Sequence, residues 1–318
     1  MLRLLQNELM KIFVRPGTYV MIGLLLLMVS VAGGVLKYQE NQAGNAGSEN
    51  WKQVLQTEIN EGRAELKEME NVPKNELIYL ERDIAVKEYR IEHDLSPNVE
   101  YSMWGFVGDA ANMIQFAGLF AIIIAAGIVS SEFNWGTIKL LLIRPINRGK
   151  ILASKYMAVL VFAFMLITVL FVYSSLLGVI LFGTAETAIP YLNYYDGGIT
   201  EQNMGLHLLI FYAMKSINMI LLATMAFMIS AVFRNSSLAI GLSIFLMFSG
   251  ASLTALLAMK FAWAKYILFA NTDLMQYFEG IPMVDGMTLP FSIIMIIIYF
   301  VLFQFLAFIV FKKRDVAA

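Results

Sequence analysis

Long apolar runs alternate with polar segments along this chain of 318 residues. Each run can cross about 30 Å of hydrocarbon as a helix that rises about 1.5 Å per residue. Only one of the runs, the fourth, contains a charged residue, Lys215. The pattern predicts an all-α integral membrane protein with six transmembrane helices, near Tyr19–Leu36, Met113–Ser130, Ala158–Phe182, Gly205–Phe233, Ser236–Met259 and Met287–Phe311.

The N-terminal residues before the first run predict an interfacial helix. Leu2, Leu5, Leu9 and Phe13 recur at helical spacing, with charged residues elsewhere around the helix. We expect this helix to lie on the inner leaflet and, with the first span, to form a unit over residues 1–36. A signal peptide is the alternative interpretation, but the apolar run is longer than a typical signal-peptide core.

Residues 37–104 form the one large polar region, and they predict an extracytoplasmic helical hairpin between spans 1 and 2. Apolar residues recur there at three-, four- and seven-residue steps on both sides of Asn71-Val72-Pro73, which breaks the helical pattern. The alternative is a solvated, mobile, charged loop. The remainder, 105–318, holds spans 2–6 and a polar connector over 131–150.

Composition supports membrane insertion. The chain is 59% hydrophobic and 15% charged, with a mean hydropathy of +0.68, whereas soluble domains contain about 25% charged residues. The net charge of −1 indicates no general attraction to nucleic acid. The absence of cysteine excludes disulfides and thiol chemistry.

The distribution of Lys and Arg predicts that both termini of this multi-pass protein of the cell (cytoplasmic) membrane are cytoplasmic. The opposite short loops hold only Lys260 and Lys265. The expected cytoplasmic side holds Arg3, Lys11, Arg15, Lys139, Arg144, Arg148, Lys150, Lys155, Arg234, Lys312, Lys313 and Arg314.

Catalytic motifs are scarce. The sequence has no G-x-x-x-x-G-K-[ST], H-E-x-x-H or G-x-S-x-G pattern. His93 and His207 are far apart and favour structural or solvated roles over metal binding. We therefore expect no enzyme activity, metal or cofactor in this chain.

The connector contains residues suited to mechanical coupling. Phe133 and Trp135 can anchor it at the headgroups, and Gly136 allows a close turn. Arg144 and Arg148 can pair with acidic residues of a partner or with lipid headgroups. The alternative is an ordinary basic loop on the cytoplasmic side.

Four features together resemble the type-2 ATP-binding-cassette (ABC) exporter permeases, in particular those that export bacitracin and antimicrobial peptides. They are the N-terminal helix, the connector from Glu132 to Arg148, Arg234-Asn235-Ser236-Ser237, and Phe311-Lys312-Lys313-Arg314-Asp315. The large polar region after the first span departs from many relatives.

The resemblance implies a homodimer, or a heterodimer with another permease, that binds ABC ATPase subunits carrying ATP and Mg²⁺. The residues that would couple this chain to the ATPase are Glu132, Phe133, Gly136, Thr137, Arg144 and Arg148. The expected function is export of an amphipathic or hydrophobic substrate such as a peptide antibiotic. The alternatives are a secondary transporter driven by an ion gradient and a membrane sensor or immunity protein without transport.

Burying the charged side chain of Lys215 in a membrane costs free energy, and this makes Lys215 a candidate for substrate binding. Tyr212 and Asn218 lie nearby in the sequence and could line the same polar path. The alternative is that the Lys215 side chain extends to the membrane interface.

Overall fold

The computed structural model describes residues 1–43, 50–68, 74–96, 101–137, 146–184, 190–195 and 198–313. Most of these residues are helical. The α-helices are α1 (Leu2–Phe13), α2 (Pro16–Ala43), α3 (Trp51–Glu68), α4 (Lys74–Glu92), α5 (Met103–Ala110), α6 (Ile114–Asn134), α8 (Arg148–Phe182), α9 (Met204–Phe233), α10 (Ser236–Ala258), α11 (Leu268–Asn271) and α12 (Leu289–Lys313). Short 3-10 helices are η1 (Ala111–Met113), η2 (Ala262–Tyr266) and η3 (Leu274–Tyr277).

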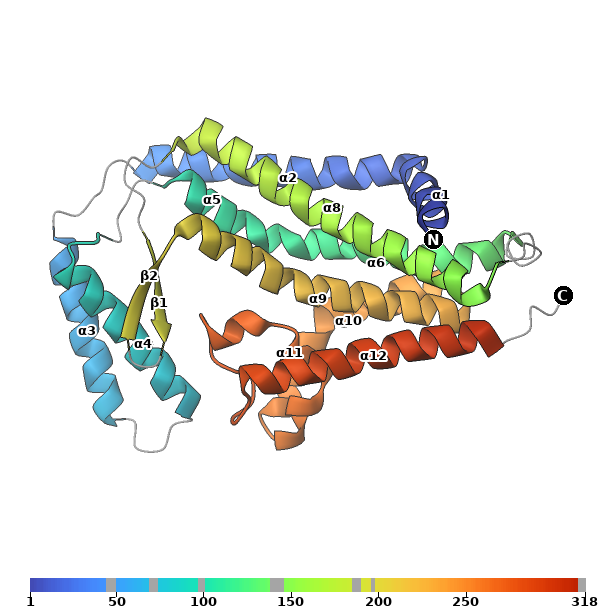
Figure 1. Cartoon of the computed structure of the whole chain (residues 1–318). Helices are drawn as coiled ribbons and strands as arrows, with labels where there is room; N and C mark the ends of the chain where they lie inside the picture. Colours follow the sequence, from blue (N-terminus) through green and yellow to red (C-terminus); the bar gives the residue numbers. More distant parts are fainter. Residues whose placement is uncertain are drawn as a thin grey trace.

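Six helical segments are long and apolar enough to cross a membrane, so the prediction of a helical multi-pass membrane protein is confirmed. They are Pro16–Gln42, Met103–Asn134, Arg148–Phe182, Met204–Phe233, Ser236–Ala258 and Leu289–Lys313. The long helices run alongside one another (Figure 1). We call the end with α3, α4 and the strands the hairpin end, and the end with α1 and the start of α8 the basic end.

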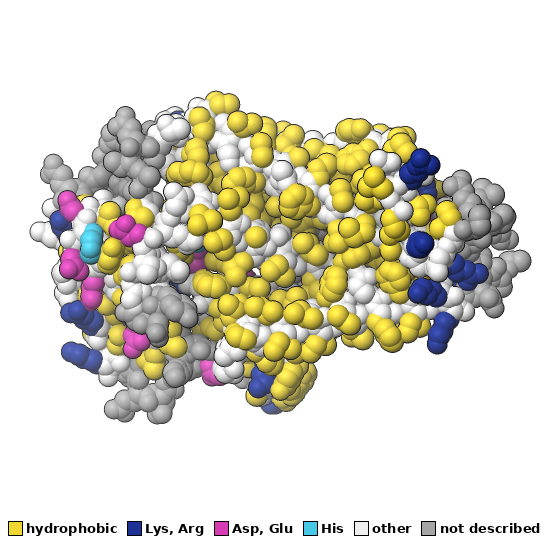
Figure 2. Space-filling model, in the orientation of Figure 1, with side chains coloured by type: hydrophobic (Ala, Val, Ile, Leu, Met, Phe, Trp, Pro, Cys, Tyr) yellow, Lys and Arg dark blue, Asp and Glu magenta, His cyan; other side chains and the backbone are white. Residues whose placement is uncertain are grey.

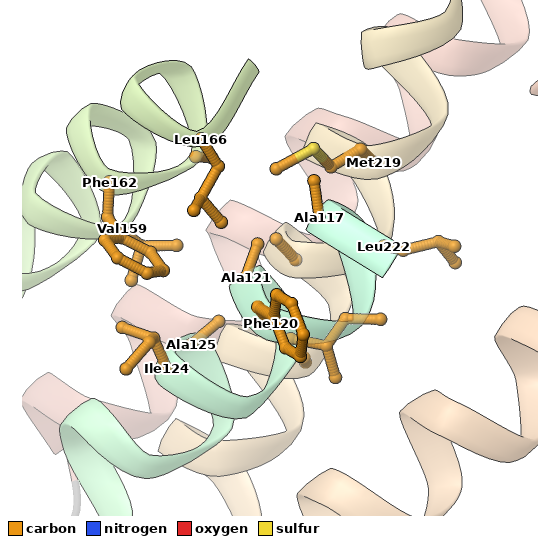
Figure 3. Packing of buried hydrophobic residues seen from close by; sticks show 14 of the residues in the cluster. Ala117, Phe120, Ala121, Ile124, Ala125, Val159, Phe162, Leu166, Met219 and Leu222 are labelled. Carbon is orange, nitrogen blue, oxygen red and sulfur yellow. The ribbon is translucent and has the colours of Figure 1, made fainter. Parts of the chain in front are cut away.

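Small residues on α6 let its neighbours pack closely around it. Ala117, Ala121 and Ala125 are fully buried, and Val159, Phe162 and Leu166 of α8 and Met219 and Leu222 of α9 pack in the same core (Figure 3). Close approach through small residues is the usual packing mode of membrane helices. α6 and α9 are therefore the central helices, whereas α2, α10 and α12 leave most of their apolar surface exposed.

Two of the predicted spans begin too late. The second span is helical from Met103 and continues through η1 into α6. The third begins at Arg148, and Asn147 caps it by accepting a hydrogen bond from the Gly149 backbone at 2.8 Å. In the sequence, the charged residues Asp109 and Lys155 lie just before the predicted starts of the second and third spans. The structure instead includes both in helices, and Lys155 is 1% exposed.

Helices α3 and α4 pack against each other through Leu55, Ile59 and Ile84, which are buried. Gly62, a weak helix former, lies where a Cβ would come within 3.2 Å of Ile84 Cγ1. Its small size therefore permits the close approach of the two helices. The Asn71-Val72-Pro73 break lies outside the described residues.

The segment between α8 and α9 contains strands, which the all-α prediction did not include. β1 (Tyr191–Tyr195) and β2 (Gly198–Gln202) form an antiparallel ribbon with Tyr191 opposite Gln202. Aromatic residues favour strands. The ribbon packs against α4, which supplies the tertiary contact that a short isolated ribbon lacks.

Charged side chains gather at the two ends of an apolar belt (Figure 2). Lys and Arg dominate the basic end, and the acidic side chains visible on this face lie toward the hairpin end. This separation is the one expected when the apolar belt is surrounded by lipid.

Candidate functional site

A cluster of four charged residues joins three helices at the basic end. Glu8 and Lys11 come from α1, Glu132 from the last turn of α6, and Lys155 from the second turn of α8. Lys155 Nζ lies 2.8 Å from Glu8 Oε2 and 3.0 Å from Glu132 Oε1. Lys11 Nζ lies 3.0 Å from Glu8 Oε1 and 2.8 Å from Glu132 Oε1. We call these four residues the charge cluster.

The charge cluster is electrically balanced and largely buried. The side chains of Lys155, Glu8 and Glu132 are only 1%, 7% and 9% exposed, while Lys11 is 44% exposed. Removing one partner from a buried ion pair costs about 3–5 kcal/mol, because the other charge is left without compensation. Burial lowers the pKa of Lys11, but its hydrogen bonds to Glu132 and Glu8 outweigh that effect and raise the pKa above 10.5.

The structure changes the interpretation of Glu132 and Lys155. The sequence predicts Glu132 as a residue that couples the chain to an ATPase, and it counts Lys155 among the basic residues of the cytoplasmic side. Both side chains face the interior, where they neutralise each other and hold α1 against α6 and α8. Sequence reasoning missed Glu8 and Lys11 as their partners. The only local signal was the three-residue spacing of Glu8 and Lys11 on one helix face.

The charge cluster continues into the first residues of the connector. The Thr137 hydroxyl donates to the Glu132 carboxylate. Gly136 adopts a φ of +69°, which favours glycine. The guanidinium carbon of Arg15 lies over the Trp135 ring, 5.2 Å from the centroid of that ring. A groove of about 750 Å³ runs between α1 and this turn, lined by Leu4, Asn7, Glu8, Met10, Lys11, Val14, Arg15, Glu132, Trp135 and Thr137.

A second polar contact holds α6 to the turn between α9 and α10. Ser130 Oγ lies 2.6 Å from Ser236 Oγ, and Ser230 Oγ donates to the Ala126 carbonyl. Arg234 ends α9 in a left-handed conformation, and its guanidinium lies 4.3 Å from the Phe133 ring centroid. The Arg234-Asn235-Ser236-Ser237 motif is therefore a turn that contacts the end of α6.

The remaining predicted coupling residues are described in part. Arg148 starts α8, and its Nη1 lies 3.5 Å from the Lys312 carbonyl at the end of α12. Arg144 lies outside the described residues. The connector thus begins and ends on helices that the charge cluster ties together.

Lys215 and Asn218 line one cavity of about 310 Å³ between α6, α9 and α10, but Tyr212 does not. The Tyr212 hydroxyl donates to the Val107 carbonyl at 2.9 Å, and its ring packs edge-on against Phe171 in the buried core. Tyr212 and Lys215 are three residues apart and lie near the same face of α9. Tyr212 nevertheless contacts α5 and α8, whereas Lys215 lines the cavity beside η1, α6 and α10. The structure therefore brings Lys215 and Asn218 together and places Tyr212 outside their cavity.

At the hairpin end, α4 is bound to the segment before α12. The Arg82 guanidinium donates to the backbone carbonyls of Phe278 and Glu279. The Glu279 carboxylate accepts from Tyr191 at 2.9 Å and lies 3.5 Å from His207 Nε2. The His207 hydrogen bond lowers the pKa of Glu279, burial opposes this, and the Tyr191 hydrogen bond lowers it further. We call Arg82, Tyr191, His207 and Glu279 the hairpin clamp.

The charge cluster joins helices through ion pairs. In the described part of the chain, no three His, Asp or Glu side chains converge as metal ligands would. The carboxylates of the charge cluster are engaged by ammonium groups. Such a cluster orients helices relative to one another.

Comparison with known proteins places the chain in a family. Residues 81–317 match the family described as "Protein of unknown function (DUF2705)". The chain is 50% identical over 319 residues to the uncharacterized protein YhcI of Bacillus subtilis (strain 168), with full coverage of both. It is 30% identical to the uncharacterized membrane protein YdbK of the same organism over 70% of this chain and 87% of that protein. With its membrane-spanning helices and a match over most of its length, the chain belongs to the DUF2705 family.

Proposed function

We propose that this chain is the membrane subunit of an ATP-driven exporter that resembles the type-2 ABC permeases. ATP is hydrolysed by a separate P-loop subunit that contacts the connector between α6 and α8. Two copies of the chain, or one copy and a related permease, form the substrate path. The cargo is an amphipathic or hydrophobic molecule such as a peptide antibiotic.

The observation that carries this proposal is the charge cluster. A subunit pressing on the connector moves the end of α6 and the start of α8, which the connector joins. Because Lys155 binds both Glu132 and Glu8, that displacement also carries α1. Closely packed elements move as units between discrete arrangements. The charge cluster makes the three helices one such unit.

The groove beside the connector supports contact with a partner. It combines apolar residues of α1 with Arg15, Lys11 and Trp135. Aromatic and basic side chains of this kind are enriched at protein interfaces. An acidic or amphipathic segment of an ATPase fits the groove by charge and polarity.

The orientation belongs to the proposal as well. The basic end faces the cytoplasm, where the ATPase is located, and α1 lies along the inner leaflet. Helices α3 and α4 form an extracytoplasmic hairpin at the opposite end. The excess of Lys and Arg at the basic end supports this orientation.

The proposal is tested by purifying the tagged full-length chain from gently solubilised membranes and identifying a co-purifying P-loop protein. The two are then reconstituted in vesicles, and ATP hydrolysis is measured with and without the membrane chain. We expect the chain to stimulate hydrolysis and Glu132→Gln to abolish most of the stimulation. Glu201→Gln at the hairpin end is the matched control and should leave it unchanged.

The rival functions give different results. Movement of a fluorescent lysolipid by the chain alone, driven by an ion gradient without ATP, identifies a secondary transporter and refutes the proposal. Ligand-dependent signalling without flux or ATPase stimulation identifies a sensor and also refutes it.

A further inference from the structure

The cavity at Lys215 is unusual because polar side chains line it within the membrane-spanning part of the bundle. Lys215 lies about 16 Å along α9 from its start, at about 1.5 Å per residue. Asn112 and Gln115 face it from η1 and α6, and Asn218 lies one turn further along α9. Three amides and one ammonium thus converge in a space of about 310 Å³.

The polar groups of this cavity are incompletely satisfied within the protein. The Lys215 Nζ contacts the Phe211 ring at 5.4 Å from its centroid, and the described carboxylates form no ion pair with it. Within the described part of the chain, Asn218 Oδ1 is buried without a hydrogen-bond partner. A cation without a carboxylate partner and a buried acceptor without a donor are costly in an apolar setting. A ligand with an anionic group and an adjacent hydrogen-bond donor satisfies both.

The rest of the cavity lining is apolar and reaches the outer surface of the bundle. Met247 and Phe248 of α10 form one wall, and Phe248 is 53% exposed. The cavity therefore borders the lipid-facing side of α10, along which an acyl chain can lie. Its volume suits a headgroup, with the apolar tail remaining outside.

We propose that this cavity binds the headgroup of an anionic amphiphile, in which a phosphate or carboxylate stands next to a hydroxyl or amide donor. Lys215 pairs with the anion, Asn112 and Gln115 donate to it, and Asn218 Oδ1 accepts from the neighbouring donor. Lipids of the bilayer and exported acyl compounds both carry this chemistry. The assignment of such a molecule as cargo rests on the proposed export function, whereas binding does not.

Binding is tested with the full-length chain in neutral detergent by native mass spectrometry. The probe is lysophosphatidylglycerol, compared with lysophosphatidylcholine of the same chain length and with glycerol phosphate, which lacks a tail. We expect one tightly bound lysophosphatidylglycerol and binding at least about tenfold weaker for the other two. The choline lipid keeps the phosphate, but its headgroup has a cation that Lys215 repels and no hydroxyl donor for Asn218, and glycerol phosphate lacks the tail.

Variants assign the bound molecule to this cavity. Lys215→Met should weaken binding about tenfold, Asn218→Leu should weaken it less, and Lys215→Arg should preserve it. Lys260→Met is the matched control, because Lys260 also lies beside an aromatic ring, 5.8 Å from the Phe261 centroid, but outside the cavity. If Lys215→Met fails to fold, Gln115→Leu takes its place. Equal binding of the zwitterionic lipid, or unchanged binding in the cavity variants, overturns the proposal.

The two sources of ligand are separated in vesicles that also contain the ATPase. ATP-dependent movement of fluorescent lysophosphatidylglycerol that requires Lys215 supports the site and identifies cargo. Binding without movement supports the site and identifies a resident lipid. Because the binding experiment needs no ATPase, failure of the export proposal leaves its result intact.

Discussion

The ammonium of Lys155 lies 3.0 Å from Oε1 of Glu132, although the two residues are 23 positions apart and flank the polar connector. The same ammonium reaches Glu8, 147 positions away on α1. Lys155 is therefore the link through which the N-terminal helix and the two helices beside the connector are held together.

Replacing Lys155 tests the energetic role of this link. Lys155→Met leaves two buried carboxylates with one partly exposed ammonium, so we expect a loss of about 3–5 kcal/mol of stability. The measurement is unfolding of the detergent-solubilised protein. Lys87→Met, which removes two ion pairs at the protein surface, with Asp83 and Glu58, should cost about 1 kcal/mol. The double variant Lys155→Met/Glu132→Gln should lose less than the sum of its single variants. Strict additivity would contradict the coupling of the two residues.

The hairpin clamp predicts acid sensitivity at the opposite end. The pKa of Glu279 is lower in the folded protein than its ordinary value of 4.5. Its stabilising contribution is therefore present above pH 4.5 and is lost as the pH falls through the lower, folded-state pKa. We expect lower hydrogen-exchange protection factors, which are corrected for the intrinsic rate at each pH, in Lys74–Glu92 as the pH falls below 4.5. Glu279→Gln should show low protection factors at both neutral and acid pH. An unchanged acid response in that variant would assign the effect to another group.

Packing between α10 and α11 predicts a sensitive glycine. A Cβ at Gly250 would lie 2.5 Å from the ring of Phe269, so Gly250→Ala should cost about 1–3 kcal/mol through overpacking. Gly241 on the same helix has nothing within 4 Å of that position. Gly241→Ala should therefore leave the melting temperature unchanged or raise it. Equal melting temperatures for Gly250→Ala and Gly241→Ala would contradict this prediction.

The turn at Gly136 predicts an effect on coupling without a large effect on stability. Its φ of +69° costs a residue with a side chain about 1–2 kcal/mol, which a small shift of this exposed turn can relieve. We expect Gly136→Ala to lower the stimulation of ATP hydrolysis several-fold while the melting temperature stays the same. Gly127→Ala, at an open helical position, is the control. Full stimulation of ATP hydrolysis by Gly136→Ala would show that this turn has no role in coupling to the ATPase.

Several features were predictable because they depend on local sequence. An apolar run of sufficient length requires a lipid environment wherever it occurs, so the spans followed from hydropathy alone. The break between the fourth and fifth spans was visible in the motif from Arg234 to Ser237, and Asn235 caps α10 by accepting from the Leu238 backbone at 3.1 Å. The apolar spacing in residues 51–92 likewise anticipated helices that pack through Ile59 and Ile84.

Other features depended on distant partners. From the sequence alone, Lys155 was one of the basic residues on the expected cytoplasmic side, since nothing near it in the chain shows that Glu8 would neutralise it. The second span looked shorter because Asp109 was expected at the headgroups just before it. Tyr212 and Lys215 looked like neighbours, yet their side chains contact different helices.

The sequence by itself determined that this chain is a helical membrane protein with basic residues gathered near one set of helix ends, because hydropathy and charge are properties of each segment alone. Tertiary structure decided which charges are buried, which polar groups share a cavity, and how α1 is joined to the connector. Those outcomes follow from the free energy of pairing charges inside an apolar bundle, and that pairing exists only after helices distant in sequence have packed together.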